Sequence, residues 1–450
     1  MTVYLEGRSP VREAYDVEQE VGMHWYVSDT PGIGGSLKRA PDHFQVTEIE
    51  DGTFEALDAD PADYPAVIVR VTLTDWDTFG FARRLAKELG IHHEAIRWAG
   101  TKDKAAISTQ LFSIRQLDPL VELPAIPGAT MEPVGRFGRQ LSFGDLQGNA
   151  FTIRVTAPEV PERHVPITDE LLAFGNGTIG VPNYFGQQRF GSIRPITHRV
   201  GLAIVAGSWE DAVLTYVGTP SDREPETTQQ ARRYVEETRD WAGALERFPP
   251  HLTHERRLCR ALSNAESITE ETYRTAFDTL ANSLKQLFVH AVQSVIFNEI
   301  LSERLAQGIP FNRAVEGDVV CFGEVTDTLG TIPDPTKTQR VTADRVDTIN
   351  RHIDSGRAFI TAPLVGTETE FGRGDIGELE RDVLEQQDVT PADFELPEPY
   401  SSTGYRRAIL ATTDVTVTDD PLEFSFALPS GSYATVIMRE YLKVHPEDLS

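Results

Sequence analysis

Cysteine and long apolar runs are both scarce in this chain of 450 residues. Cys259 and Cys321 are its two cysteines, which could form one disulfide but cannot make a zinc site by themselves. We expect both to be buried thiols, as in a cytoplasmic protein. No apolar run approaches the roughly 20 residues of a membrane-spanning helix, and the first residues lack the pattern of a secretory signal. The sequence therefore predicts a cytoplasmic protein without a membrane partner.

Lysine is scarce as well. The chain has 7 lysines and 35 arginines against 69 acidic residues, for a formal net charge of −27. An acidic, lysine-poor surface keeps a protein hydrated and dispersed at very high salt, so we interpret the composition as halophilic. At molar salt the range of charge interactions falls to about 3 Å, and local basic segments then matter more than the net charge.

Two such basic segments occur. Residues 183–200 contain three arginines, one histidine and no acidic residue, and residues 96–115 contain four cations and one acid. Aromatic residues are interleaved with the cations in both segments, which suits phosphate contact and base stacking. This composition permits RNA binding without establishing it.

The length predicts two or three domains, and the N-terminal third alternates between strand and helix patterns. Residues 66–73 are rich in β-branched side chains and predict a strand, after which Thr74 or Asp75 is expected to cap a helix that ends at Gly90. Further strands are expected at 111–117 and 151–157.

The middle of the chain differs from both of its ends. A helical pattern fills residues 201–305 and is most regular over 282–304. Short strands and a capped helix at 342–353 follow, and residues 375–399 are acidic and proline-rich. Strand patterns return at 408–417 and 422–428, before a helix pattern at 430–443. A helical insertion within one α+β domain fits this order best.

Residues 98–110 (WAGTKDKAAISTQ) contain the most informative carboxylate of the chain. Asp103 lies between two lysines in a turn-prone stretch that begins with glycine, and small hydroxyl residues follow it. Neighbouring lysines lower the pKa of a carboxyl group, which suits a nucleophile or a base better than a general acid. A lone aspartate in a turn is also a common helix cap or solvated charge, so both interpretations stay open.

Four other residues could belong either to the hydrophobic core or to a functional site. Phe44 lies in an expected strand, and Asn149 lies in an expected turn just before a strand. Arg189 is surrounded by aromatic, amide and glycine residues. Tyr433 is expected in the first turn of a helix, where its ring either joins the core or lines a pocket.

Taken together, these stretches resemble the TruD family of RNA pseudouridine synthases, in its archaeal branch. The motifs follow the family's order from Lys38 to Glu440, so the resemblance covers nearly the whole chain. Two departures are Ser108, where the family usually has threonine, and His43, where an acid usually precedes the phenylalanine. The matching stretches are the KxxPxxF-V-E pattern from Lys38 to Glu48, GTKDKAAISTQ at 100–110, GNAF at 148–151, PNYFGQQRFG at 182–191, QSVIFN at 293–298 and LPSGSYATVIMRE at 428–440.

The resemblance implies an α+β pseudouridine synthase fold with a mixed, mainly antiparallel sheet. The catalytic domain would comprise residues 1–180 and 401–450, interrupted by a TruD-type α/β insertion domain at 181–400. The implied activity is the isomerisation of uridine to pseudouridine in tRNA, usually at position 13, by a monomer without cofactor or metal.

The resemblance also implies roles for the residues singled out above. Asp103 would be the catalytic carboxylate, either attacking C1′ of the ribose or removing the proton from C2′. Lys38 would pair with Asp103 and keep it charged. Phe44 and Tyr433 would contact the target nucleotide, Asn149 would hydrogen-bond it, and Arg189 would contribute to substrate binding. The target uridine must be flipped out of its stack to be reached.

Two other functions remain open from the residues themselves. A non-catalytic RNA-binding protein would use the same basic segments and leave Asp103 a structural role. A hydrolase of N-glycosidic bonds would also place an aspartate beside a flipped base.

Overall fold

The computed structural model describes residues 12–102, 104–115, 117–118, 122–191 and 193–449. The chain forms two compact units that each contain more than one stretch of sequence. Unit 1 comprises Met1–Tyr26, Pro182–Phe322 and Pro333–Ile409, and unit 2 comprises Val27–Val181, Gly323–Ile332 and Leu410–Ser450. The sequence-based boundaries at 180 and 400 lie close to two of these divisions, and the domain roles stay a prediction.

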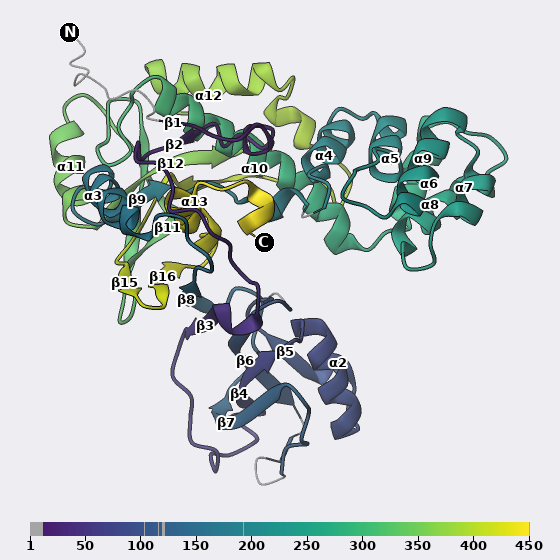
Figure 1. Cartoon of the computed structure of the whole chain (residues 1–450), viewed down its shortest axis with the longest axis horizontal. Helices are drawn as coiled ribbons and strands as arrows, with labels where there is room; N and C mark the ends of the chain where they lie inside the picture. Colours follow the sequence, from purple (N-terminus) through teal and green to yellow (C-terminus); the bar gives the residue numbers. More distant parts are fainter. Residues whose placement is uncertain (1–11, 103, 116, 119–121, 192, 450) are drawn as a thin grey trace. The chain divides into compact units, whose positions relative to one another are not determined.

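Unit 2 is built on an eight-stranded mixed sheet (Figure 1). The strand order is β15-β16-β8-β3-β6-β4-β7, and β5 also pairs with β6. β3 and β6 run parallel, whereas the other neighbouring strands of this sheet are antiparallel. The α+β class and the mainly antiparallel sheet are therefore confirmed. The strands are β3 (Phe44–Glu50), β4 (Ala66–Thr74), β5 (Ile96–Trp98), β6 (Ile107–Arg115), β7 (Ala129–Phe137), β8 (Leu146–Arg154), β15 (Thr416–Asp419) and β16 (Leu422–Pro429).

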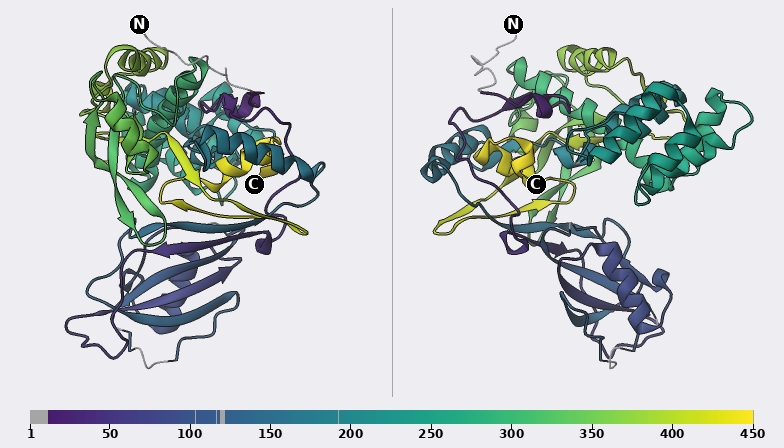
Figure 2. Two further views of the ribbon diagram at one scale, coloured as in Figure 1. Left: turned by 90° about the vertical axis from the view of Figure 1, so that its left-hand side faces the viewer. Right: turned by 45° about the vertical axis from the view of Figure 1, so that its right-hand side comes forward.

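Helix α2 (Thr78–Leu89) packs on one face of this sheet (Figure 2). Alternate side chains of β4, from Val67 to Leu73, meet the apolar stripe of α2 and exclude water from the space between them. The predicted cap is wrong, because the carboxylate of Asp77 accepts the N–H of Gly80 at 2.8 Å. The predicted end is confirmed, since Gly90 takes the left-handed conformation with φ +67°.

Strand β8 begins five residues earlier than the sequence pattern predicted, so Asn149 lies within the strand rather than in a turn before it. The reason lies at Gly148. A Cβ atom there would lie 2.2 Å from the carbonyl oxygen of Leu428 on the adjacent strand β16. This glycine permits a close approach of two strands, and the pattern alone could not distinguish that role from a turn.

Smaller elements of unit 2 connect and flank the large sheet. The expected single strand at 408–417 is instead divided among β13, β14 and β15, of which β14 pairs with β9. The expected helix after Gly431 is confirmed as α13. These elements are η1 (Pro41–His43), η2 (His93–Ala95), η3 (Pro161–Arg163), α3 (His164–Phe174), β9 (Ile179–Pro182), β14 (Leu410–Thr413), α13 (Ala434–Leu442) and η6 (Pro446–Leu449).

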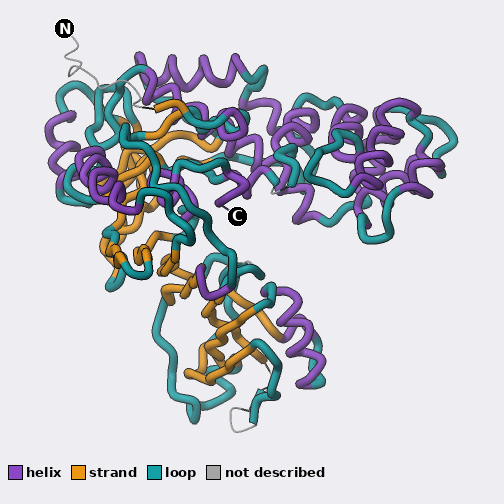
Figure 3. The backbone as a smooth tube through the Cα atoms, viewed as in Figure 1, coloured by secondary structure: helices purple, strands orange, loops and turns teal. Residues whose placement is uncertain are grey.

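Unit 1 contains most of the helices, and Figures 1 and 3 show α5 to α9 grouped together. The helical pattern predicted for 201–305 is confirmed, and the most regular part is α10. Both cysteines are buried free thiols as predicted, and burial raises the pKa of each to about 12. The helices are α1 (Asp16–Gln19), η4 (Gln187–Phe190), α4 (Thr197–Val205), α5 (Trp209–Val217), α6 (Glu226–Thr238), α7 (Trp241–Arg247), α8 (Thr253–Ser263), α9 (Glu270–Asp278), α10 (Asn282–Ala306), α11 (Val346–Asp354), α12 (Gly374–Gln386) and η5 (Pro391–Phe394).

A four-stranded sheet in the order β11-β10-β12-β13 belongs mainly to unit 1, and Gly323–Ile332, the end of β10 and the start of β11, is the part assigned to unit 2. A short pair, β1-β2, also belongs to unit 1. Helix α12 lies where the sequence pattern indicated only acidic and proline-rich character. Its Ile376, Leu379 and Val383 are buried at helical spacing, which the surrounding acidic residues obscure. No helix in the described ranges is long and apolar enough to cross a membrane. The strands are β1 (Arg12–Glu13), β2 (Trp25–Tyr26), β10 (Val319–Thr326), β11 (Gly330–Arg340), β12 (Ala358–Leu364) and β13 (Tyr405–Ala408).

Candidate active site

The parallel pairing of β3 and β6 brings two predicted site segments to one edge of the sheet. Gln45 is paired with Ile107, so both strands begin at this edge. Lys38 precedes β3, and the segment that contains Asp103 precedes β6. Asp103 itself lies outside the described residues, whereas Lys102 before it and Lys104 after it are described.

Three phenylalanines form an aromatic row on one face of the sheet. Phe151 of β8 is paired with Val46 of β3 and with Phe426 of β16, so these side chains project from the same face. The Phe151 ring lies 6.1 Å from the Phe44 ring and 5.5 Å from the Phe426 ring, measured between centroids. Phe44 was predicted as a site residue. Phe151 and Phe426 were not, although Phe151 belongs to the GNAF motif.

Lys38 lies above one end of this aromatic row. Its Nζ is 4.7 Å from the centre of the Phe44 ring, a distance at which the ring face attracts a cation. The Lys38 backbone is left-handed, with φ +55°, an unusual conformation for a side chain other than glycine. The ammonium group of Lys38 is thereby held at the edge where β3 and β6 both begin.

Asn149 lies on the same sheet face, directly opposite Glu48 of β3. Its Oδ1 atom is buried, and no hydrogen-bond donor reaches it among the residues that the structure describes. Leaving such an acceptor without a partner is unfavourable by about 1–3 kcal/mol. A polar ligand with an N–H group would satisfy this oxygen.

A buried ion pair joins Glu48 to the segment before Asp103. Lys102 Nζ donates to Glu48 Oε1 at 2.7 Å, and the two side chains are 8% and 3% exposed. The other carboxylate oxygen of Glu48 accepts the N–H of Leu111 at 3.3 Å. Burial raises the pKa of Glu48, and Lys102 opposes that rise. Glu48 was assigned no role from the sequence, although it ends the KxxPxxF-V-E pattern.

Two further buried side chains hold the same segment. Thr78 Oγ1 accepts the N–H of Lys102 at 2.9 Å and lies 3.1 Å from Gln110 Oε1, to which it donates. The Gln110 amide in turn donates to the carbonyl of Gly100 at 3.3 Å. Both Thr78 and Gln110 are 1% exposed. Helix α2 and strand β6 therefore fix the backbone immediately before Asp103.

Tyr433 is the N-cap residue immediately before helix α13, just beyond β16. The turn is held against β8, since Ser430 donates its N–H to the carbonyl of Gln147 at 2.9 Å. Tyr433 is half-buried, and β16 ends beside the part of β8 that contains Asn149. The structure thus brings Tyr433 to the end of the strand pair that presents Asn149.

A buried polar network fixes the far end of α13. Glu440 accepts hydrogen bonds from the N–H of Val27 at 3.2 Å and from Ser28 Oγ at 3.0 Å. Lys443 Nζ donates to Ser28 Oγ at 2.6 Å. Glu440 is 1% exposed and Lys443 is 8% exposed, so these contacts anchor α13 within unit 2.

Arg189 belongs to unit 1, whereas the other predicted site residues belong to unit 2. It lies in η4, and its Nε donates to Ser294 Oγ at 3.3 Å. Its guanidinium carbon lies 5.8 Å from the centre of the Phe185 ring. These contacts position Arg189 within unit 1, and its role toward a substrate stays a prediction.

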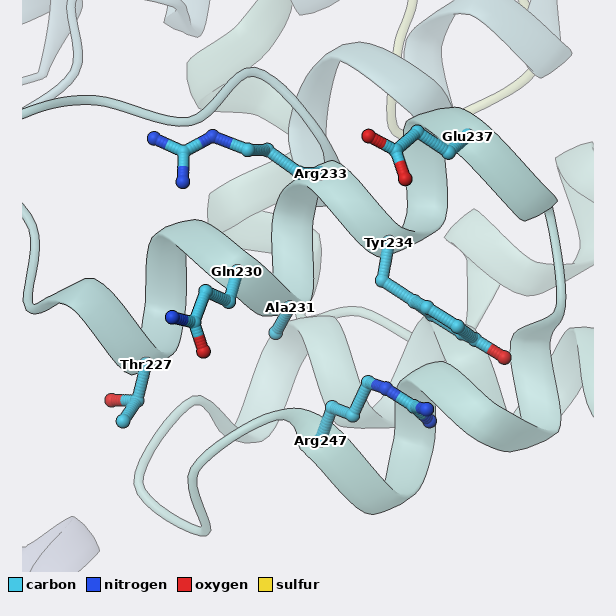
Figure 4. Close-up of a pocket in the computed structure, with 7 residues that line it drawn as sticks. All are labelled: Thr227, Gln230, Ala231, Arg233, Tyr234, Glu237 and Arg247. Atoms are coloured by element: carbon cyan, nitrogen blue, oxygen red, sulfur yellow. The ribbon is translucent and has the colours of Figure 1, made fainter.

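A pocket of about 390 Å³ lies in unit 1, between α6 and α7 (Figure 4). Arg247 stacks on Tyr234, with its guanidinium carbon 3.7 Å from the ring centre. Arg247 also donates to the carbonyl of Gly243 at 2.8 Å, and Arg233 donates to Gln229 at 2.8 Å. Because these charged groups already have local partners, we assign the pocket no catalytic role.

The chain is similar along nearly its whole length to known proteins of one family. The family model of tRNA pseudouridine synthase D (TruD) matches residues 20–441. A probable tRNA pseudouridine synthase D of Halobacterium salinarum is 53% identical over 97% of this chain and 99% of its own length. One from Natronomonas pharaonis is 50% identical over 98% of this chain and 100% of its own length. These relatives fit the halophilic interpretation of the composition and the resemblance of the motifs to the archaeal branch of the family.

A solved structure gives the same result for the fold. The crystal structure of the putative tRNA pseudouridine synthase D from Methanosarcina mazei superposes with a TM-score of 0.81 at 39% sequence identity. The match covers 97% of this chain and 100% of that one. The resemblance found in the sequence is thus confirmed along almost the entire chain, and the protein belongs to the TruD family of tRNA pseudouridine synthases, which are isomerases.

Proposed function

We propose that this protein converts uridine to pseudouridine at position 13 of tRNA, and that Asp103 is its catalytic carboxylate. The observation that carries this assignment is the sheet edge where β3 and β6 both begin. The segment of Asp103 leads into β6 at that edge, and Lys38 lies over Phe44, the first residue of β3 and one member of the aromatic row. Membership of the family indicates which reaction the protein catalyses. The lysine and aromatic side chains at this edge offer an environment that suits this reaction.

The reaction rearranges one nucleotide without a net gain or loss of atoms. The N1–C1′ bond of uridine breaks, the base turns, and C5 joins C1′ while the proton on C5 is released and N1 gains a proton. Asp103 either attacks C1′ or removes the C2′ proton, and in both cases it must be ionised. The ammonium group of Lys38 favours the ionised carboxylate and holds it in place.

The remaining groups bind the flipped uridine. The buried Oδ1 of Asn149 is suited to accept the N–H of a uracil ring, and its amide N–H₂ is suited to donate to a carbonyl oxygen. Phe44, Phe151 and Tyr433 offer aromatic surface against which the detached base is retained. Water is excluded from an apolar floor of this kind, which strengthens polar contacts with the base.

The proposal extends to the domains of the protein, its location in the cell and its partner. Residues 1–180 and 401–450 form the catalytic domain, and residues 181–400 form the insertion domain, where Arg189 contacts tRNA. The protein acts in the cytoplasm as a monomer, and tRNA is its macromolecular partner.

The decisive experiment uses the full-length enzyme and an unmodified tRNA transcript at high salt. Wild-type enzyme should form pseudouridine at position 13, and a transcript with cytidine at that position should stay unmodified there. Asp103→Asn and Asp103→Ala should abolish the product while binding of the transcript is retained.

Other outcomes would favour the alternative functions. Release of free uracil with an abasic site would identify a hydrolase. Tight binding with unchanged RNA, for wild type and variants alike, would identify a non-catalytic RNA-binding protein. Pseudouridine formation by Asp103→Ala would refute the assignment of the carboxylate.

A further inference from the structure

Two phenylalanines on the surface of unit 2 lie next to the start of the segment that contains Asp103. Phe79 is 60% exposed and Phe143 is 77% exposed. A single exposed aromatic side chain needs no explanation, but two beside one functional segment indicate a contact surface. Hydrogen bonds from the residues next to these phenylalanines to that segment establish where the two rings lie.

Phe79 lies in the first turn of α2, next to the start of the segment. The preceding residue, Thr78, accepts the N–H of Lys102 at 2.9 Å. The Phe79 ring packs edge-on against Trp98, with the ring centres 5.0 Å apart and the planes at 86°. Trp98 is the last residue of β5, where the segment starts. One side of the Phe79 ring is therefore supported, and much of the ring stays open to solvent.

Phe143 is anchored to the beginning of the same segment through its own neighbour. Gly144 donates its N–H to the carbonyl of Ala99 at 2.8 Å. The turn around Phe143 is braced by Asp145, whose carboxylate accepts the N–H of Ser142 at 2.7 Å. Phe143 is thus presented to solvent by a fixed backbone rather than by packing of its ring.

The charge of this region favours an anionic partner. Residues 78–115 contain seven lysines and arginines against three acidic residues, in a chain whose net charge is −27. Six of the cations are exposed, namely Arg83, Arg84, Lys87, Arg97, Lys104 and Arg115. Three of the chain's seven lysines fall between residues 87 and 104. Phosphate groups are the anions that such a mixture of cations and aromatic rings suits best.

We propose that Phe79 and Phe143 stack on nucleotides of the substrate RNA that flank the flipped uridine. This role rests on the proposed function, since it presumes that the uridine is delivered to Asp103. Flipping removes one base from a stack and exposes the faces of its neighbours. Aromatic side chains cover such faces without reading the base sequence. Stacking also survives molar salt, which screens contacts between cations and phosphates.

The test measures RNA affinity and catalysis separately. Phe79→Ala, Phe143→Ala and the double variant are each compared with wild type for KM and kcat on the tRNA transcript. Equilibrium binding of the same transcript is measured in the Asp103→Asn background. Each alanine should weaken binding and raise KM by about fivefold to a hundredfold, and the two effects should multiply in the double variant, while kcat changes less than threefold.

Matched substitutions distinguish stacking from other roles. Phe143→Tyr should keep the affinity within about twofold, whereas Phe143→Leu should lose most of it, because leucine is apolar but cannot stack. Tyr405→Ala removes an aromatic ring that is 57% exposed in unit 1, and it should leave KM unchanged. The deficit of the alanine variants should persist at molar salt.

Several outcomes would overturn the assignment. They are wild-type affinity in the double alanine variant, equal affinity for Phe143→Leu and wild type, or a deficit that disappears at high salt. Melting temperatures equal to that of wild type would confirm that the variants fold. Phe143→Ala is the less ambiguous of the two alanine variants, because the Phe143 ring is already largely exposed to solvent. An active Asp103→Ala enzyme would refute the catalytic carboxylate, whereas the KM values of the phenylalanine variants would still test the RNA contact.

Discussion

Glu48 and Lys102 form an ion pair of 2.7 Å that is almost completely buried. It joins the centre of the large sheet to the residue immediately before Asp103. Removing one member of a buried pair leaves an uncompensated charge and typically destabilises a protein by about 3–5 kcal/mol. The pair therefore couples the position of the Asp103 segment to the integrity of the sheet.

Lys102→Met should impair catalysis far more than RNA binding. The Glu48 carboxyl would lose its cation, and the segment would lose its anchor on β3. A displacement of about 1 Å at the reacting groups reduces the rate about a hundredfold, so kcat should fall by ten- to a hundredfold while KM stays within about threefold. Single-turnover rates and transcript binding, measured together, check this expectation.

The double variant Glu48→Gln/Lys102→Met should recover much of the lost stability, because no unpaired charge then remains in the buried site. Lys337→Met serves as the control, since its ion pair with Asp334 involves a lysine side chain that is 51% exposed. A Lys102→Met enzyme with wild-type kcat would show that the pair does not position Asp103.

Asn149→Ala should lower kcat/KM without destabilising the fold. Its buried Oδ1 has no donor within the described part of the chain, so truncation removes an unsatisfied acceptor. Loss of hydrogen bonds to the uracil ring should reduce kcat/KM by roughly five- to a hundredfold. Steady-state kinetics and thermal melting measure the two effects separately.

Asn350 is a matched control for Asn149. Its side-chain amide bonds both the N–H and the carbonyl of Ala314, at 2.8 Å and 3.0 Å. Asn350→Ala should therefore lower the free energy of unfolding by about 1–3 kcal/mol and leave KM unchanged. A large loss of stability in Asn149→Ala, with unchanged kinetics, would assign Asn149 a structural role instead.

The stability of unit 1 should depend on the protonation of His24. Its Nε2 lies 2.8 Å from Glu299 Oε2, and this hydrogen bond raises the pKa of His24 above its ordinary value of 6.5. A raised pKa means that the folded state binds the proton more tightly than the unfolded chain. The stabilisation is therefore complete below about pH 6.5 and is lost as the pH rises through the raised pKa.

Denaturant melts at constant salt between about pH 6 and pH 8 would measure this dependence. His24→Gln should reduce the decline in stability over that range. Because the two side chains are 30% and 23% exposed, the difference should stay below about 1 kcal/mol. Identical pH profiles for wild type and variant would contradict the assignment to His24.

Lowering the salt concentration should unfold the protein. With a net charge of −27, acidic side chains repel one another strongly once the range of charge interactions exceeds about 10 Å, as it does near 0.1 M salt. Circular dichroism should show loss of helix signal as salt is reduced from molar to dilute buffer. An unchanged spectrum and melting temperature in dilute buffer would refute the halophilic interpretation.

Local sequence patterns predicted much of the secondary structure. They failed mainly where contacts between segments far apart in the chain determine the structure. β4 follows from its β-branched side chains, α10 from side-chain periodicity, and Gly90 ends α2 as expected, because each of these signals acts within a few residues. α12 was missed because acidic residues obscure its apolar stripe. Asn149 was assigned to a turn because a glycine, Gly148, precedes it. That glycine instead permits the close approach of a strand that lies more than 270 residues away in the chain.

The sequence by itself determined the family, the class of reaction and the identity of the carboxylate to test, since those depend on motifs that keep their order and spacing. Only the tertiary structure decided that Glu48 pairs with Lys102 and that Phe44, Phe151 and Phe426 form one row. It also decided that a buried oxygen of Asn149 finds no donor among the residues that the structure describes. These relationships depend on strand register and on burial, which arise when segments far apart in the chain pack together. A side chain's partner is fixed by that packing, whereas its residue type is fixed by the sequence.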